Sequence, residues 1–121
     1  MRLQTTQITK WRQIQKLDGV LFLDTTVKTG DPVFAPTWDI VMGVKSGKIT
    51  PEEYTVEYTR LMRESYKNNP GRWLSVCQLD RVCIACYCPP DTFCHRHLLK
   101  SMFAGVCKHH GIPFLDDGEF R

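Results

Sequence analysis

Residues 82 to 99 read VCIACYCPPDTFCHRHLL, and this stretch decides the fold. Its first part, from Val82 to Tyr87, is an apolar run of the kind found in strands that are buried on both faces of a parallel sheet. The prolines at 89 and 90 then break the strand. A helix is expected from near Phe93 to His109, with an apolar stripe along one side and Gly111 past its end. A strand, a turn and a helix in this order predict one unit of a parallel α/β sheet.

The chain before and after this unit supplies further strands and helices. Val20 to Leu23 is a second continuous apolar run that ends at Asp24, and we expect it to be the central strand. Thr50-Pro51-Glu52-Glu53 predicts a helix start, because it combines a capping Thr, a Pro in the first turn and a Glu that can reach back. The other expected elements are a strand at 2–7, helices at 9–17, 37–44 and 50–67, a helical or irregular link at 72–79 and a strand at 112–115.

The alternation of strands and helices predicts a small three-layer α/β fold, with a mostly parallel sheet and helices on both faces. Its 121 residues suffice for one hydrophobic core, so we expect a single domain over residues 1–121. No stretch reaches the roughly 18 apolar residues of a membrane span, so no membrane partner is expected. Residues 1–6 lead into polar sequence and not into the apolar region of a signal peptide, which favours a cytoplasmic location.

The six cysteines are concentrated in one part of the chain. Five of them fall within 18 residues, and these are Cys77, Cys83, Cys86, Cys88 and Cys94. In a reducing compartment such cysteines are core residues, metal ligands or nucleophiles and do not form a disulfide framework. The net charge of +3 is mild and compatible with an anionic ligand.

The start of the last helix is the first candidate site. Free backbone N–H groups and the positive end of the helix dipole attract an anion there, and Arg96 adds a guanidinium group suited to phosphate. The same field favours the thiolate of Cys94, so that Cys94 would serve as a nucleophile and His95 would donate or accept a proton. The alternative is that Cys94 packs against the sheet and Arg96 forms an ordinary salt bridge.

Asp24 would face the same sheet edge, either as a further catalytic group or as a carboxylate that caps the turn over residues 25–29. Four residues are candidates for ligand contact, namely Thr25, Lys28, Trp38 and Cys88. The expected partner is an anionic small molecule or nucleotide, or a nucleic-acid end. Broader nucleic-acid binding ranks last, since scattered basic residues are usually solvated. Those residues are Lys10, Arg12, Lys16, Arg60, Arg63 and Lys67.

A zinc site is the alternative function, in a non-catalytic interaction protein. Cysteine and histidine side chains between residues 86 and 97 have the ligand types of a tetrahedral zinc site. The candidate ligands are Cys86, Cys88, Cys94 and His97. Strand alternation puts Cys83 and Cys86 on opposite faces, so that only Cys86 and Cys88 share one. A chelator would then lower the melting temperature, because structural metal binding is coupled to folding.

The segments Val82–Cys88 and Cys94–Leu99 resemble the C-terminal signature of a bacterial and phage family, the domain-of-unknown-function 488 (DUF488) family. The likeness extends to Val20–Asp24, which looks like that family's strand ending in Asp, and to residues 34–38 and 54–61. The resemblance implies a small parallel α/β fold with Cys94-His95-Arg96 on its functional edge, and it supplies no established reaction. The chain departs from the family pattern at Thr25, where an Arg often follows the Asp.

Overall fold

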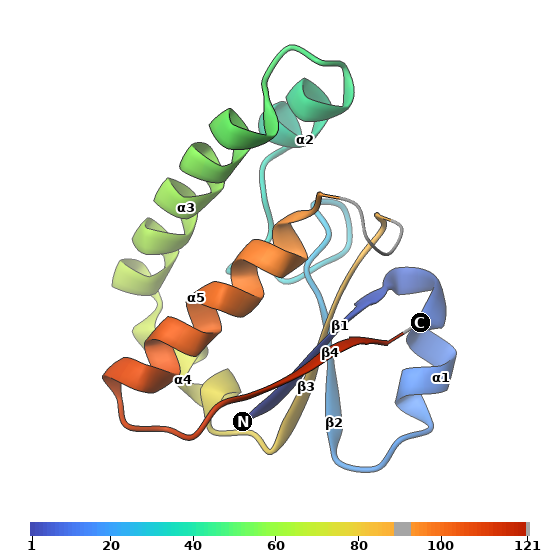
Figure 1. Ribbon diagram of the computed structural model, residues 1–121, viewed down its shortest axis with the longest axis vertical. Coiled ribbons are helices and arrows are strands. Elements are labelled where there is room, and N and C mark those ends of the chain that lie inside the picture. The colour runs from blue at the N-terminus through green and yellow to red at the C-terminus, as the bar shows by residue number, and fades with distance from the viewer. Residues whose placement is uncertain (89–92, 121) are drawn as a thin grey trace.

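The computed structural model describes residues 1–88 and 93–120 and contains a four-stranded, all-parallel sheet with helices packed around it (Figure 1). The expected turn at residues 89–92 lies outside the described part. The strands are β1 (Arg2–Gln7), β2 (Val20–Asp24), β3 (Arg81–Cys86) and β4 (Leu115–Phe120). The helices are α1 (Trp11–Gln15), α2 (Trp38–Lys45), α3 (Pro51–Asn68), α4 (Pro70–Cys77) and α5 (His95–His109), with a short 3-10 helix at Ile8–Lys10 before α1. The expected small parallel α/β fold is confirmed.

The order of the strands in the sheet is β2-β3-β1-β4. The prediction that Val20–Asp24 is the central strand is therefore wrong: β2 lies at an edge, and Val20 to Phe22 are only partly buried. β3 lies between β2 and β1, and every residue of it after Arg81 is buried. An apolar run indicates that a strand is covered, but it does not reveal which other strands pair with it. The cysteine-rich strand is thus held on both edges.

Helices cover both sides of the sheet. α5 packs on β1 and β3, whereas α1 packs on β2 and lies on the opposite side from α3, α4 and α5 in Figure 1. Leu99, Phe103 and Cys107 recur every four residues along α5 and are fully buried. The Phe103 ring lies 4.9 Å from Trp73 of α4 and 5.4 Å from Phe34, measured between ring centroids. These aromatic contacts join α4 and α5 to the loop that carries Phe34.

The last strand begins later than expected. The apolar segment 112–115 predicts a strand, but β4 runs from Leu115 to Phe120 through the polar residues Asp116 and Asp117. β4 pairs in parallel with β1, and its register shifts near Gly118, which has a φ of 76°. Glycine adopts such a positive φ readily, so it accommodates the shift. Because all four strands are parallel, their carboxyl ends lie on the same side of the sheet. The last residues of the strands are Gln7, Asp24, Cys86 and Phe120.

The helix boundaries follow the local sequence signals closely at α3 and less closely elsewhere. Thr50 caps α3 through the predicted box, in which its hydroxyl accepts from the Glu53 N–H and the Glu53 carboxylate accepts from the Thr50 N–H. The first helix starts at Trp11 and not at Thr9, because a 3-10 turn precedes it. Within residues 1–88 and 93–120, no helix is long and apolar enough to cross a membrane.

The capping box provides a test of the fold. Thr50→Ala removes the oxygen that accepts from the Glu53 N–H at 3.1 Å, so we expect the free energy of unfolding to fall by about 1 kcal/mol. Urea denaturation measures this change. Thr50→Ser keeps the hydroxyl and should retain most of the stability; an equal loss in both variants would contradict the capping role.

Candidate functional site

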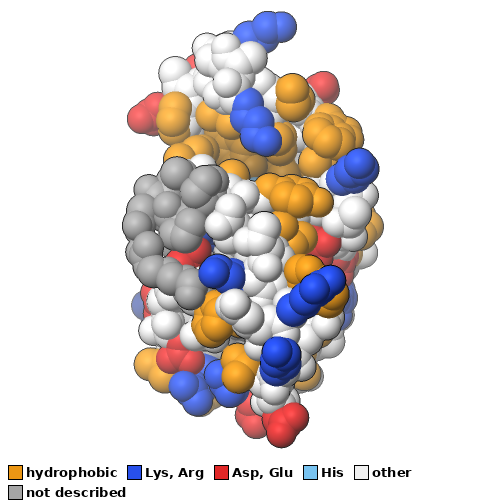
Figure 2. Space-filling model, turned by 90° about the vertical axis from the view of Figure 1, so that its right-hand side faces the viewer, with side chains coloured by type: hydrophobic (Ala, Val, Ile, Leu, Met, Phe, Trp, Pro, Cys, Tyr) orange, Lys and Arg blue, Asp and Glu red, His pale blue; other side chains and the backbone are white. Residues whose placement is uncertain are grey.

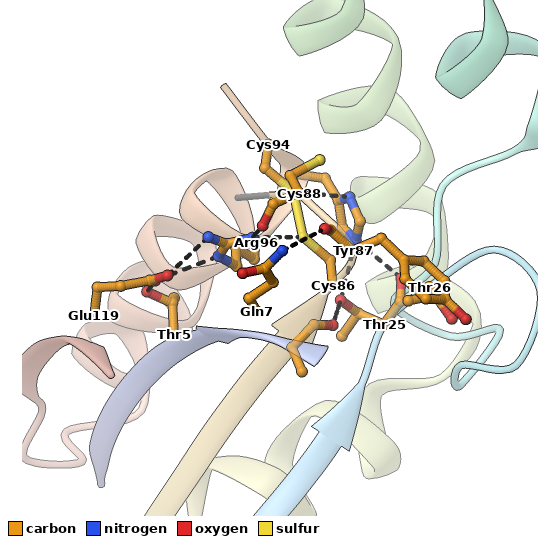
Figure 3. The surroundings of a disulfide bond; sticks show 12 residues. Thr5, Gln7, Thr25, Thr26, Cys86, Tyr87, Cys88, Cys94, Arg96 and Glu119 are labelled. Carbon is orange, nitrogen blue, oxygen red and sulfur yellow. Dashed lines mark hydrogen bonds and ion pairs between the residues drawn. A yellow bond between two sulfur atoms is a disulfide. The ribbon is translucent and has the colours of Figure 1, made fainter. Parts of the chain in front are cut away.

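Three cysteines meet where β3 ends and α5 begins. Cys86 is the last residue of β3, Cys88 follows it by two residues, and Cys94 is the N-cap of α5. Their sulfur atoms all lie within 4.8 Å of one another. The Cys86 and Cys94 sulfurs are joined as a disulfide, as Figure 3 shows, although their Cα atoms are 7.9 Å apart. Disulfides usually join Cα atoms roughly 4.4–6.8 Å apart. The backbone thus holds the two cysteines at a wide separation with their side chains converging.

His95 lies beside this cluster with its ring orientation fixed. Its Nε2 atom is 2.9 Å from the Thr25 carbonyl oxygen and 3.0 Å from the Thr25 hydroxyl. Since a carbonyl can only accept, Nε2 carries the proton and Nδ1 has a free lone pair. Nδ1 lies 3.7 Å from the Cys94 sulfur. Burial lowers the pKa of His95 to about 4, against weaker opposition from the Thr25 hydrogen bond. His95 is therefore a neutral imidazole at neutral pH.

Arg96 is fully buried behind the cysteines and points toward β4. Its Nη2 atom forms a salt bridge of 2.8 Å with Glu119, which also accepts from the Thr5 hydroxyl. Its Nη1 atom donates to the Cys86 sulfur at 2.8 Å and to the Cys88 carbonyl oxygen at 2.7 Å (Figure 3). The salt-bridge alternative from the sequence describes this geometry. Glu119 itself escaped prediction, because the last strand was expected to end at residue 115.

A cavity of about 500 Å³ opens in front of the cysteine cluster. Three predicted ligand-contact residues, Lys28, Trp38 and Cys88, line it together with Cys94 and His95. The remaining lining residues are Thr26, Val27, Pro36, Val41, Val44, Lys45, Pro51, Tyr54, Cys86, Tyr87 and Phe93. Figure 2 shows hydrophobic side chains gathered toward the α2 end of the molecule, with Lys or Arg side chains among them. The cavity is thus mainly apolar, with two lysines among its lining residues.

Two other predicted residues support the loop that carries Lys28. The Asp24 carboxylate accepts from the Thr26 N–H at 2.9 Å and from the Thr29 hydroxyl at 2.6 Å. This is the turn-capping role that the sequence left as an alternative, and Asp24 is not among the residues that line the cavity. Gly30 closes the turn so tightly that an added Cβ would lie 2.4 Å from the Thr26 nitrogen. Thr25 is fully buried and acts on the site through His95.

The sequence did not single out every residue that the structure brings to this region. Lys45, at the end of α2, lines the cavity, and no local motif marks it. His97, a predicted metal ligand, is not in the three-cysteine group. The other three predicted metal ligands, Cys86, Cys88 and Cys94, do lie together, because the start of α5 brings Cys94 next to the end of β3.

Comparison with known proteins gives one match. A family model described as the active DUF488-N3 subclade (DUF488-N3a) matches residues 5–105, which run from the second half of β1 through the cysteine cluster and most of α5. No curated protein and no solved structure matches the chain. The match covers the segments on which the resemblance rested.

Removing the buried guanidinium should destabilise the fold. Arg96→Met leaves the Glu119 carboxylate, whose side chain is 10% exposed, without its cation, and we expect a loss of about 3 kcal/mol in urea denaturation. The double variant Arg96→Met/Glu119→Gln removes the unpaired charge and should recover part of that loss. A double variant no more stable than Arg96→Met would contradict this account of the pair.

His95 should make stability depend on pH. Its pKa rises from about 4 in the folded protein to about 6.5 on unfolding, so only the unfolded chain takes up the proton as pH falls through this window. His95 causes no loss of stability well above pH 6.5, and the loss grows to roughly 3 kcal/mol toward pH 4. His95→Gln keeps a donor for the Thr25 carbonyl and does not titrate. In urea denaturation of reduced, metal-free protein, wild type should lose more stability than this variant between pH 7 and 5; parallel losses would refute the assignment.

Proposed function

We propose that this chain, which belongs to the DUF488 family, holds a divalent metal ion, most simply Zn²⁺, at the floor of a pocket for a small anionic ligand. The observation that carries the proposal is the convergence of Cys86, Cys88 and Cys94 within 4.8 Å at the inner wall of the cavity. The proposed activity is chemistry on that ligand at the metal. The proposal keeps the anion pocket expected from the sequence and assigns Cys94 to metal binding.

When the Cys86–Cys94 disulfide is reduced, the three cysteines are close enough for their sulfurs to bind a common ion. Zinc binds thiolates at about 2.3 Å, which separates the sulfurs of a tetrahedral site by about 3.8 Å. The Cα atoms of Cys86 and Cys94 are 7.9 Å apart, which is wider than is usual for a disulfide. In the reduced protein, an ion between the two sulfurs would link the two residues at this wider separation. Three protein ligands and one position toward the cavity is the arrangement typical of catalytic zinc. Thiolate ligands also require a reducing compartment, so we propose that the protein works in the cytoplasm.

The surroundings of the cysteines favour the charged state that a metal needs. The Arg96 guanidinium donates to the Cys86 sulfur at 2.8 Å, and a charge-assisted hydrogen bond of this kind stabilises a thiolate. Groups that hydrogen-bond to metal ligands orient them and tune the metal. Arg96 is therefore a positioning residue in this proposal, and the ligand's charge is met by Lys28 and Lys45 instead.

His95 is suited to handle a proton next to the metal. Its neutral ring turns the Nδ1 lone pair toward the Cys94 sulfur, while the Thr25 carbonyl holds the other nitrogen. A bound zinc ion would polarise an oxygen of the ligand or of water as a Lewis acid. His95 would then accept a proton at Nδ1, which makes it the acid–base candidate of the site.

A second candidate function keeps Cys94 as a nucleophile and needs no metal. The contact of 3.7 Å between the Cys94 sulfur and His95 Nδ1 favours it, since a neighbouring base activates a thiol. We rank this function second, because a single nucleophile does not account for the two further cysteine sulfurs that lie within 4.8 Å of Cys94. In this case Cys94 in metal-free, reduced protein would react with iodoacetamide faster than the buried Cys77 and Cys107.

The metal proposal is tested by loading the reduced protein with Zn²⁺ and reading the bound ion by native mass spectrometry. We expect one ion per chain, and a chelator should lower the melting temperature of the loaded protein. Substituting Co²⁺ should give the intense sulfur-to-metal charge-transfer absorption of a thiolate site. Cys86→Ala, Cys88→Ala and Cys94→Ala should each weaken metal binding more than tenfold, because even the loss of a group that hydrogen-bonds to a metal ligand typically costs about 10–100-fold.

Cys83→Ala is the matched control, because Cys83 is fully buried on the same strand and lies outside the cluster. It should keep the metal even if it lowers stability. If wild type binds no stoichiometric ion, or if Cys83→Ala loses the metal as readily as Cys94→Ala, the metal proposal fails. Rapid alkylation of Cys94 in a protein that binds no metal would instead favour the nucleophile.

A further inference from the structure

We propose that the ligand of this pocket is a nucleotide, whose base stacks on exposed aromatic rings and whose phosphate is met by lysines. The inference rests on the pocket of the proposed function and names the chemical class that fills it. It requires that the same cavity offers flat apolar surfaces and positive charge. The structure provides both among the residues that line the cavity.

The aromatic lining is unusually exposed. Trp38 is 54% exposed, Tyr87 54% and Phe93 41%, and the three come from separate parts of the chain, at the start of α2, after β3 and before α5. Single exposed aromatic residues are common on protein surfaces, but three that line one cavity form a surface for a planar ligand. Stacking on such rings is how proteins hold bases without reading their edges.

The ring of Phe93 is also supported from behind. Tyr54 of α3 is 3% exposed and packs edge-on against Phe93, with 5.3 Å between the ring centroids and 85° between the planes. Tyr54 in turn stacks on Tyr58, whose hydroxyl donates to the Phe34 carbonyl oxygen at 2.6 Å. A ring backed in this way loses little conformational freedom when a ligand stacks on it.

The charged residues of the cavity favour a ligand that also carries an anionic group. Lys28 and Lys45 are exposed and line it, and no Asp or Glu is among the lining residues that the structure describes. An anionic group would therefore meet two cations without a competing carboxylate. Its volume of about 500 Å³ falls within the range for small-molecule sites, roughly 300–1,000 Å³. A purely apolar ligand would leave the lysines unused, and a simple phosphate would leave the rings unused.

The same chemistry comes from two sources, a free nucleotide or a nucleotide within a single strand. Binding is measured by isothermal titration calorimetry on the reduced, zinc-loaded protein. The probes are the four ribonucleoside monophosphates, adenosine, ribose 5-phosphate and a four-residue oligoadenylate. At least one monophosphate should bind more tightly than adenosine and ribose 5-phosphate, because each of these lacks one half. Tighter binding of the oligonucleotide than of the free monophosphate would identify a strand as the source.

Two pairs of variants localise the binding. Trp38→Ala should weaken binding of the best monophosphate by about tenfold or more, the scale of one stacked base. Trp11→Ala is the control, because Trp11 is 41% exposed and lines a different cavity. Lys28→Ala/Lys45→Ala should weaken binding in a salt-dependent manner, whereas Lys67→Ala/Lys108→Ala, on α3 and α5, should not.

The inference is overturned if no monophosphate or oligonucleotide binds at millimolar concentration, if ribose 5-phosphate binds as tightly as the monophosphates, or if Trp38→Ala behaves like Trp11→Ala. The bound zinc is counted by native mass spectrometry in the same samples. If the protein binds zinc but no nucleotide, this inference is refuted and the metal proposal is still supported. A protein that binds nucleotides but no zinc refutes the metal proposal alone.

Discussion

The fold depends on Arg96, whose buried side chain contacts three separate parts of the chain. Its guanidinium is fully buried, and burying a cation is costly unless acceptors surround it. The acceptors come from the end of β3, from the residue two positions later and from β4, so the position of the charge fixes all three relative to α5. Cys86 and Cys88 are therefore held in place by the same group that holds the last strand. A shift of β4 would therefore move the guanidinium and, with it, the hydrogen bonds to Cys86 and Cys88.

Local signals in the sequence predicted the parts of the fold that depend on local physics. The capping box at Thr50 appears as expected, because its hydrogen bonds join residues three positions apart. The strand before Cys88 and the helix after Cys94 were also predicted, since their apolar patterns extend over several turns or residues. The order of strands was not predictable in this way. Val20–Asp24 and Val82–Cys86 are both apolar runs, and only their pairing partners make one an edge and the other the centre.

The candidate site was predictable to a similar degree. The predicted ligand-contact residues near the start of α5 include Cys88, Lys28 and Trp38, and all three line one cavity. They meet because the loops that follow parallel strands all lie at the carboxyl end of the sheet. The role of Arg96 depends on Glu119, which is 23 residues away and lies on a strand whose limits were misjudged. The neutral state of His95 depends on burial by the fold and on a carbonyl 70 residues earlier. Long-range partners of this kind leave no pattern in the sequence near the residue they affect.

The strand order also has a consequence for how the chain folds during synthesis. β1 leaves the ribosome first, but both of its neighbours in the sheet, β3 and β4, come from the last third of the chain. The first strand must therefore wait, unpaired, until at least residue 81 has emerged. Pairings between such distant segments slow folding and leave strand edges open to other chains in the meantime. The polar residues Gln4, Thr5 and Thr6 make the unpaired β1 less prone to aggregate than an apolar strand, which suits the strand that waits longest for its first partner.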